Sequence, residues 1–448
     1  ERAVTELADG PGRLRALVDL RSTLLMEAAA GTGKTALMAG RLTMMLAEGF
    51  DPAHIAAITF TELAASEIAA RVHRYVDELL AGRVPEPLRL ALPHGLADTQ
   101  RASLAAAREA LDGLTASTIH GFCQDIIRQY AAEADIDPGA EVIDADAADA
   151  AFDAVFERWL RRRLSVVTPV PADPIAVLSR SDPREVVATL RDLAGFRRKH
   201  LAARPPAADF SQRPDLQLRE AVGAFARWAQ DHPHEQGTAA AIDDLDVLAR
   251  HFENAFAAEP PFERLWQLVH PPRVTLMSRR ESFDLKAPQR KTAWKSAAGK
   301  ERGPLLAEEA DRLFREADAA YRAAMGVAAT AVVAILSDAL EEVLSDYAEF
   351  KRAAAVLDFD DLLIRAARML RAHEDVRRAL GERYLHILVD EFQDTDPLQA
   401  EIIFRIASEA GAANWQDAPT RPGALFLVGD PKQAIYQFRG ANAGSYGQ

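Results

Sequence analysis

Cysteine is almost absent from this chain, which has Cys123 alone among its 448 residues. A single cysteine cannot close an intrachain disulfide, and it cannot build a metal site from several thiolates. Disulfides are typical of secreted proteins rather than cytosolic ones. We therefore predict a reducing, cytoplasmic setting.

A long apolar run is also missing. The longest uncharged stretch lies between Arg322 and Asp338, and it is shorter than the ~20 residues that a helix needs to span a bilayer. It predicts a buried helix, and we expect no membrane partner. No basic segment followed by an apolar one opens the chain, so a secretory signal peptide is not recognised.

The chain has no excess of positive charge, since its formal net charge is −14. A protein that coats nucleic acid over its whole surface is therefore disfavoured. A local basic groove is still compatible, because phosphate contacts depend on patches. One such patch runs from residue 273 to residue 302, with nine Lys or Arg against three Asp or Glu. This segment, with Trp294, is either a DNA-binding surface or a solvated loop.

Four short apolar runs are each followed by a polar loop. Such runs are typical of buried strands in a parallel α/β sheet, where ligands bind at the carboxyl ends of the strands. The four runs are Leu24–Met26, Ile55–Ile58, Tyr384–Val389 and Ala424–Val428.

A long segment of helical pattern, rich in Ala, Arg, Glu and Leu, extends from about residue 144 to residue 346. Connections within one sheet are usually short, so a gap of this length predicts an inserted domain. We predict one α/β domain formed by residues 1–140 and 351–448, interrupted by an all-helical insertion at residues 141–350.

A phosphate-binding loop follows the first apolar run and precedes a helical pattern. Its glycines let backbone N–H groups close on phosphate oxygens. Lys34 is placed to reach the β- and γ-phosphates, and the Thr35 hydroxyl is placed to bind magnesium. A glycine-rich turn without a ligand is the alternative. The residues that we expect to bind ATP are Ala28, Ala29, Ala30, Gly31, Thr32, Gly33, Lys34 and Thr35.

Two adjacent acids, Asp390 and Glu391, follow the third apolar run. This strand would deliver them to the sheet edge where the phosphate loop lies. We expect Asp390 to hold Mg²⁺ with Thr35, and Glu391 to orient or deprotonate the attacking water. Gln433 follows the fourth run and is placed to contact the γ-phosphate, although its segment taken alone is typical of an ordinary turn. The predicted catalytic residues are Lys34, Glu391 and Gln433.

Six motifs share their order with those of a known family. They are GTGKT at 31–35, ITFTE at 58–62, TIHGF at 118–122, LDFDDL at 357–362, DEFQD at 390–394 and GDPKQAIYQFRGA at 429–441. With these motifs the chain resembles UvrD/Rep-like superfamily 1 DNA helicases, and TFTE, HGFCQ and DPKQAIY are closest to the RecB/AddA branch. The resemblance implies a RecA-like sheet with a phosphate loop and an inserted helical domain.

The resemblance also implies a function, that of an ATP-dependent DNA helicase or translocase of 3′-to-5′ polarity that uses ATP and Mg²⁺. RecB/AddA-like helicase-nucleases act in double-strand break repair and recombination, on single-stranded and duplex DNA, together with other subunits. Aromatic faces stack on any base without reading sequence, as a translocating protein requires. The insertion is expected to contact DNA as well. The residues assigned to DNA by the resemblance are Thr59, Phe60, Thr61, Thr118, His120, Tyr436, Phe438 and Arg439.

The chain departs from the family pattern in three places. No Gln precedes the phosphate loop and Arg21 lies near its usual place, so the mode of adenine recognition stays open. Leu63 stands where UvrD-like chains often have a Lys. The sequence stops at Gln448, so we expect a fragment without the second motor domain, weakly active or inactive by itself. A stand-alone UvrD/Rep-like repair helicase and a nucleotide- and DNA-binding subunit without productive hydrolysis remain alternatives.

Overall fold

The structure is a computed structural model that describes residues 9–28, 33–165, 173–180, 183–200, 204–232, 236–277, 285–287, 291–409 and 414–430. The chain forms two compact units. Residues 1–148 and 351–448 make the first unit, and residues 149–350 make the second. The first unit contains a parallel sheet and the second is helical, which is the α/β architecture with a helical insertion that the sequence predicts.

The sheet of the first unit has five strands in the order β1-β7-β6-β2-β3. Every neighbouring pair is parallel. The four apolar runs of the sequence all form strands of this sheet, as predicted, whereas β3 was not predicted. The strands are β1 (Leu24–Glu27), β2 (Ile55–Thr59), β3 (Thr115–Thr118), β6 (His386–Val389) and β7 (Leu425–Gly429).

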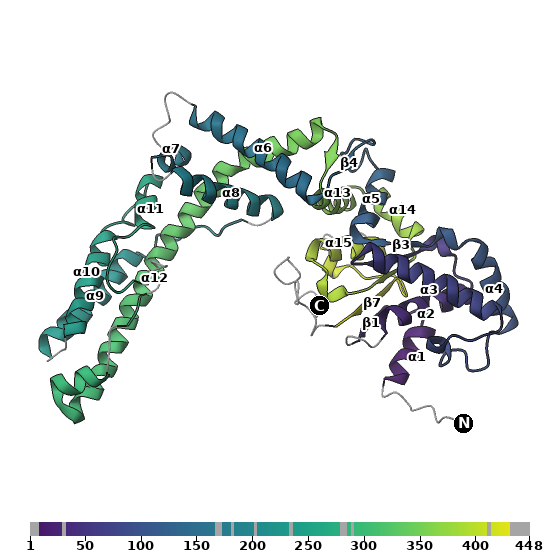
Figure 1. Cartoon of the computed structure of the whole chain (residues 1–448), viewed down its shortest axis with the longest axis horizontal. Helices are drawn as coiled ribbons and strands as arrows, with labels where there is room; N and C mark the ends of the chain where they lie inside the picture. Colours follow the sequence, from purple (N-terminus) through teal and green to yellow (C-terminus); the bar gives the residue numbers. More distant parts are fainter. Residues whose placement is uncertain are drawn as a thin grey trace. The chain divides into compact units, whose positions relative to one another are not determined.

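Helices cover both faces of this sheet (Figure 1). Successive side chains of a strand point to opposite faces, so Ile55 and Ala57 join one core while Ala56 and Ile58 join the other. The first core includes α1 (Gly10–Val18), α2 (Lys34–Ala47), α3 (Glu62–Leu80) and α4 (Asp98–Glu109). The second includes α5 (Ile119–Gln129), α13 (Phe359–Ala372), α14 (Glu374–Arg383) and α15 (Pro397–Ala407).

A second, two-stranded parallel sheet joins β4 (Glu141–Val142) to β5 (Val356–Leu357). It therefore pairs the segment that precedes the helical unit with the segment that follows it. Next to β5, Lys351 Nζ lies 2.9 Å from Asp358 Oδ2 and 2.6 Å from Asp361 Oδ2. All three side chains are at most 14% exposed, so this is a buried cluster of one cation and two acids.

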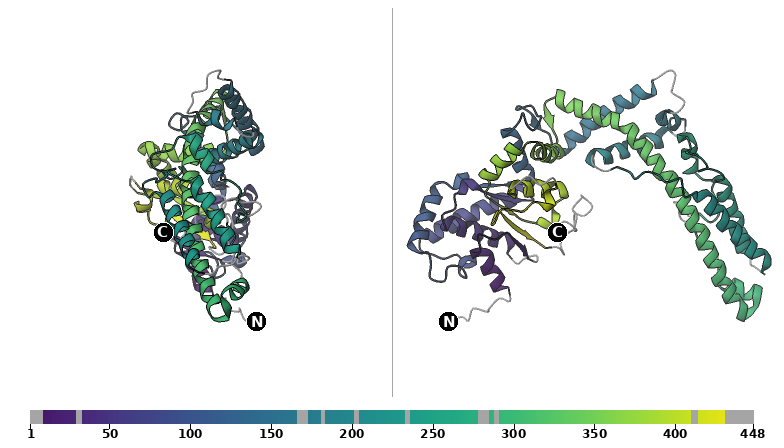
Figure 2. Two further views of the ribbon diagram at one scale, coloured as in Figure 1. Left: turned by 90° about the vertical axis from the view of Figure 1, so that its left-hand side faces the viewer. Right: turned by 180° about the vertical axis from the view of Figure 1, so that it is seen from behind.

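The helical unit is built along one long helix, α12 (Lys291–Ala353), which is interrupted at Gly299 by a φ of +82°. Only a residue without a side chain adopts that backbone readily. In both views of Figure 2 and in Figure 1, α9 and α10 lie alongside α12. The other helices are α6 (Ala145–Leu164), α7 (Pro174–Leu178), α8 (Pro183–Lys199), α9 (Pro214–Asp231), α10 (Gln236–His251) and α11 (Phe262–Leu268).

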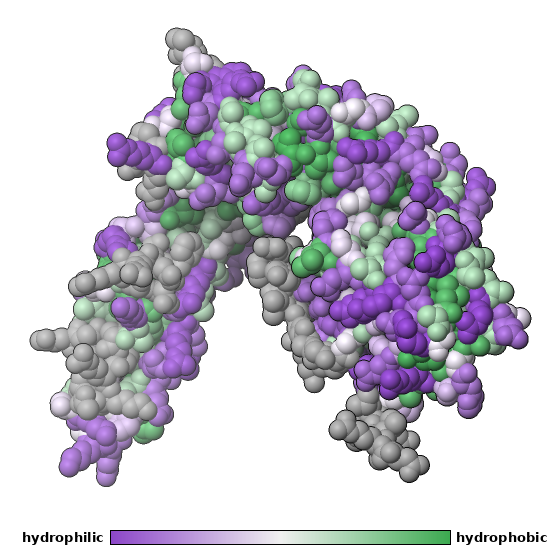
Figure 3. Space-filling view, turned by 45° about the vertical axis from the view of Figure 1, so that its right-hand side comes forward, coloured by the Kyte–Doolittle hydropathy of each residue, from purple (hydrophilic) through white to green (hydrophobic). Residues whose placement is uncertain are grey.

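By length and composition alone, the part of α12 from Trp294 to Ala353 is the one helix among the described residues that is apolar enough to cross a membrane. The core of the helical unit accounts for this composition, because Tyr321, Ala324 and Met325 are fully buried in it. On the face of this unit that Figure 3 shows, hydrophilic residues run along its length. The apolar stretch thus supplies a core helix, which agrees with the buried helix predicted between Arg322 and Asp338.

Candidate nucleotide and DNA site

The phosphate loop connects the end of β1 to the start of α2. Ala28 donates its backbone N–H to Gly429 O on β7 at 3.0 Å. Gly33 precedes α2 with a φ of +82°, a left-handed conformation that favours glycine. Lys34 and Thr35 form the first turn of α2, where unpaired backbone N–H groups and the helix dipole favour an anion.

Lys34 contacts Glu391, which is 357 positions away in the sequence. Lys34 Nζ lies 2.6 Å from Glu391 Oε2. The lysine is 9% exposed and the glutamate side chain 35% exposed, so the pair opens to solvent on the side of the acid. This ion pair joins the phosphate-loop helix to the paired acids at the carboxyl edge of the sheet.

Asp390 is buried at the end of β6. Its backbone N–H donates to Ile58 O on β2 at 2.9 Å, and its Oδ1 accepts the backbone N–H of Glu391 at 3.0 Å. Burial raises the pKa of Asp390 to about 6, and the negative charge of Glu391 adds to the shift. A carboxylate in this position gains from a nearby cation, because a cation offsets both effects.

Glu391 has a φ of +54°, in the left-handed region that residues with side chains rarely adopt. Backbone strain of this kind is found mostly where surrounding contacts enforce it, and functional sites are common examples. One of these contacts comes from Gln393, whose Nε2 donates to Glu391 Oε2 at 2.6 Å. Oε1 of the same amide accepts the backbone N–H of Asp430, after β7, at 2.9 Å.

Two threonines assigned to DNA lie at this same edge. Thr59 and Thr118 are register partners at the ends of β2 and β3, and both are buried, at 3% and 8% exposure. Their hydroxyls are used within the chain, because Thr59 Oγ1 donates to Thr61 O at 2.9 Å. Thr118 Oγ1 donates to Glu62 Oε1 at 2.7 Å. The exposed atoms next to them, rather than these two hydroxyls, are the ones open to a ligand.

Both segments also start helices. Thr61 Oγ1 accepts the backbone N–H of Ala64 at 3.2 Å and caps α3. Thr118 Oγ1 accepts the backbone N–H of Gly121 at 3.1 Å and caps α5. Two helix N-termini therefore begin at the carboxyl edge of the sheet beside α2, and helix N-termini favour phosphate oxygens.

Two exposed phenyl rings accompany these helix starts. Phe60 is 43% exposed and Phe359, the first residue of α13, is 45% exposed. The ring of His120 meets the Phe359 ring edge-on, with 5.6 Å between centroids. Burial lowers the pKa of His120, and the nearby Asp396 opposes that shift. His120 is thus more readily neutral than a histidine in water.

A small cavity of about 20 Å³ lies between the end of β2 and the end of β6. Thr59 and Phe60 line it from one side, and Asp390, Glu391 and Asp394 line it from the other. A volume of this size accommodates about one water molecule. The paired acids and the segment assigned to DNA are thus separated by little more than one small cavity.

Half of the predicted site residues lie outside the residues that the structure describes. They are Ala29, Ala30, Gly31, Thr32, Gln433, Tyr436, Phe438 and Arg439. Their predicted contacts with nucleotide and DNA stay predictions.

Comparison with known families matches residues 11–448 to the model of the UvrD/REP helicase N-terminal domain. The chain belongs to the UvrD/REP helicase family. This match covers both the sheet unit and the helical unit, and it agrees with the family that the six sequence motifs indicate.

Individual relatives of this UvrD/REP helicase chain are RecB and AddA helicase/nuclease proteins. It is 28% identical to "RecBCD enzyme subunit RecB" of Escherichia coli (strain K12), over 95% of this chain and 35% of that protein. It is 28% identical to the AddA chain of the "ATP-dependent helicase/nuclease" of Desulfitobacterium hafniense (strain DSM 10664 / DCB-2), over 96% and 32%. The corresponding chain from Moorella thermoacetica is 27% identical, over 96% and 31%. The chain spans about a third of the length of these relatives.

Three residues of the site were not singled out from the sequence of this UvrD/REP helicase chain. Gln393 and Phe359 lie inside the motifs DEFQD and LDFDDL, but the motif letters do not reveal what their side chains contact. Glu62 ends the ITFTE motif and pairs with Thr118 from the next strand. The signal available in sequence was their position in motifs, and their partners come from elements far away in the chain.

In the helical unit, the prediction for Trp294 was wrong. Trp294 is fully buried and lies 5.7 Å from Trp228 between ring centroids, so it belongs to the core and not to a surface. A large indole gains most when its apolar area is packed. Residues 278–284 and 288–290 of the basic stretch lie outside the described residues.

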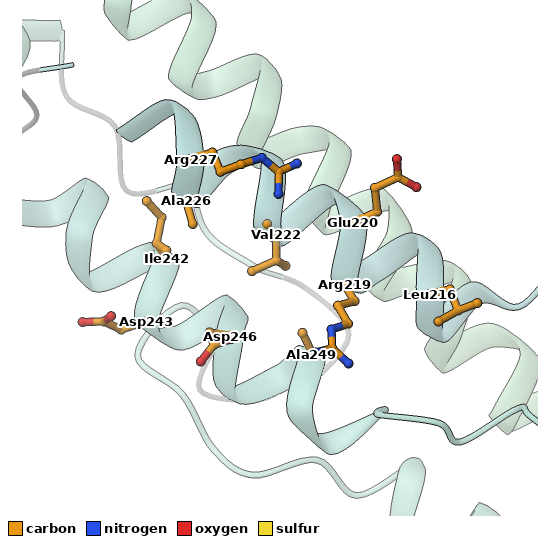
Figure 4. Close-up of a pocket in the computed structure, with 11 residues that line it drawn as sticks. Leu216, Arg219, Glu220, Val222, Ala226, Arg227, Ile242, Asp243, Asp246 and Ala249 are labelled. Atoms are coloured by element: carbon orange, nitrogen blue, oxygen red, sulfur yellow. The ribbon is translucent and has the colours of Figure 1, made fainter. Parts of the chain in front are cut away.

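A groove of about 540 Å³ runs between α9 and α10 of the helical unit. Figure 4 shows Arg219, Glu220 and Arg227 along α9, facing Asp243 and Asp246 of α10. Three acids against two arginines give this groove no excess of positive charge. It therefore adds no support to DNA binding by this part of the helical unit.

Proposed function

We propose that this chain is the ATP-binding and single-strand-binding part of an ATP-dependent DNA helicase of the RecB/AddA kind. Its role would be in double-strand break repair and recombination, with 3′-to-5′ movement along one strand. One observation carries the proposal. The backbone of Asp390 is hydrogen-bonded to Ile58 at 2.9 Å, directly before Thr59 and Phe60, so the acids and the segment assigned to DNA are adjacent.

ATP binding would begin at the N-terminus of α2. The phosphates meet the backbone N–H groups around Gly33 and the ammonium of Lys34. An anion of this charge competes with Glu391 for Lys34, which is 2.6 Å from that carboxylate. Binding would therefore weaken the ion pair and leave the Glu391 carboxylate facing the phosphates, where it can orient and deprotonate a water.

The residues fit a magnesium ion. Asp390 is a buried carboxylate with a pKa raised to about 6, and Thr35 lies in the first turn of α2. No group of three or more His, Cys, Asp or Glu that could hold a metal occurs in the described part of the chain. Mg²⁺ typically binds through one or two protein oxygens plus phosphates and water, so this donor set suffices. When bound, the ion supplies charge neutralisation and orients the β- and γ-phosphates.

The DNA strand would pass over the ends of β2 and β3. Phe60 and Phe359 offer exposed aromatic faces, and stacking on them requires no particular base. The N-termini of α3 and α5 add backbone N–H groups for phosphates. Tyr436, Phe438 and Arg439 would contribute further contacts. The insertion at residues 141–350 is also proposed to touch DNA, and the names of the relatives, which call them subunits, suggest further protein partners.

The experiment is to measure binding of a labelled oligonucleotide to this chain, single-stranded against duplex, over a salt series. We expect tighter binding of the single strand, with little dependence on base sequence. Each phosphate contact should contribute about 0.7 to the slope of log affinity against log salt. Equal binding of an arbitrary polyanion such as heparin, with no preference for single strands, would contradict the proposal.

A further inference from the structure

The amide of Gln393 bridges the acids after β6 and the end of β7. Oε1 accepts the backbone N–H of Asp430 at 2.9 Å. Nε2 donates to Glu391 Oε2 at 2.6 Å and to Asp394 Oδ2 at 3.2 Å. Gln393 is 4% exposed, so water competes little for these groups. One side chain therefore ties a predicted catalytic acid to a second strand of the sheet.

The orientation of this amide is fixed by its partners. A backbone N–H can only donate, so the atom that faces Asp430 must be the oxygen. The nitrogen then faces the carboxylates of Glu391 and Asp394, which accept hydrogen bonds when ionised. Turning the amide by half a turn would oppose donor to donor and acceptor to acceptor. The bridge therefore has one arrangement, and a movement of Glu391 must strain it or carry Gln393 along.

Both ends of the bridge lead to groups with a proposed role. Glu391 is also bonded to Lys34, the residue that ATP phosphates would attract. Asp430 is followed in sequence by Gln433, Tyr436, Phe438 and Arg439, which are predicted to contact nucleotide and DNA. Loss of the Lys34 contact would shift Glu391, and the shift would reach the Asp430 backbone through one buried side chain.

We infer that Gln393 is a positioning residue that couples the nucleotide site at Glu391 to single-strand binding by the segment that follows β7. The inference rests on the proposed function. It assigns to Gln393 no contact with ATP or DNA. Its removal should therefore leave each ligand's own affinity nearly intact and abolish the effect of one ligand on the other. A purely structural role predicts the opposite pattern, a loss of stability with unchanged coupling.

The experiment compares the affinity of the chain for labelled oligothymidine with and without a magnesium complex of a non-hydrolysable ATP analogue. The ratio of the two affinities is the coupling factor, which is typically about fivefold or more for linked sites. Two variants test the bridge. Gln393→Met keeps the length of the side chain but removes all three hydrogen bonds. Gln393→Glu keeps an acceptor for Asp430 and removes the donor to Glu391.

A matched control is available in the same cavity. Gln399 lines it, and its Oε1 accepts the backbone N–H of Asp396 at 3.3 Å. Gln399→Glu introduces the same charge nearby and retains that acceptor. It should therefore keep the coupling factor of the wild type. Thermal unfolding of all three variants shows which of them fold.

The inference predicts that coupling falls below about twofold in both Gln393 variants, while the affinity for each ligand alone stays within about threefold. Wild-type coupling in either folded Gln393 variant would overturn it, as would an equal loss in Gln399→Glu. If the wild-type chain binds both ligands without coupling, the inference is wrong although the two binding sites stand. If the wild type binds neither ligand, the proposed function fails, and the inference with it.

Discussion

Lys34 of α2 and Glu391 after β6 form an ion pair of 2.6 Å. One of these residues follows the phosphate loop and the other belongs to the paired acids. The same lysine is the residue that an arriving triphosphate would attract, so nucleotide binding and release of the acid are linked by competition for one ammonium group. The predictions below test this arrangement and the fold around it.

Lys34→Met should weaken nucleotide binding by roughly 10- to 150-fold, because a hydrogen bond to a charged group contributes about 1.5–3 kcal/mol. Fluorescence of a labelled ATP analogue measures the affinity. Arg74→Met is a suitable control, since it removes one positive charge from an arginine that is 58% exposed on α3. An equal loss in both variants would show that only the overall charge matters.

Asp390→Asn should stabilise the protein against unfolding at neutral pH. The pKa of Asp390 is raised from 3.8 to about 6, so the folded state holds its proton more tightly than the unfolded state does. This contribution to stability is complete below pH 3.8 and is lost as the pH rises through 6. Wild type and variant should therefore be similar near pH 4, and the variant should gain up to about 3 kcal/mol at pH 7.

Urea unfolding at several pH values measures this difference. Asp112→Asn, at an exposed position after α4, controls for the loss of a negative charge. If the advantage of Asp390→Asn is the same at pH 4 and pH 7, burial of an ionised Asp390 is not its cause.

Phe60→Ala should lower the affinity for single-stranded DNA by roughly 5- to 150-fold, because stacking of a base on an aromatic ring contributes about 1–3 kcal/mol. The ring is 43% exposed, so stability should change little. Leu63→Ala is the matched control. Leu63 is 72% exposed one turn away but has no aromatic face. Anisotropy of a labelled oligonucleotide measures both, and comparable losses would argue against stacking.

Lys351→Met should destabilise the first unit by about 3 kcal/mol, because it leaves the buried carboxylates of Asp358 and Asp361 without their cation. Burial and the charge of Asp358 raise the pKa of Asp361, so the two acids repel each other. Asp361→Asn removes that repulsion and should rescue much of the loss in the double variant. Additive effects of the two substitutions in urea unfolding would contradict this account.

The sheet could be predicted from sequence where strands are continuously apolar. Leu425 to Val428 and Ile55 to Ile58 are buried on both faces, and such strands read as uninterrupted apolar runs. The missed strand, β3, consists of Thr115-Ala-Ser-Thr118 and pairs on one side only, with β2. A short edge strand of small polar residues has no such pattern.

The candidate site was predictable in its parts but not in its connections. The motif letters identify Lys34 and Glu391, yet their contact depends on how strands 357 residues apart pair in the sheet. The role of Gln393 depends on the Asp430 backbone, which arrives from another strand. Trp294 failed for a related reason, since an aromatic residue in a basic stretch turned out to pack against Trp228.

The most direct test of the account is the affinity of the wild-type chain for a labelled, non-hydrolysable ATP analogue with magnesium, with and without saturating single-stranded DNA. The account predicts that single-stranded DNA changes this affinity about fivefold or more, because the two sites share one sheet edge. Duplex DNA of equal length should have less effect. An affinity that is the same with saturating single-stranded DNA as without it would contradict the account.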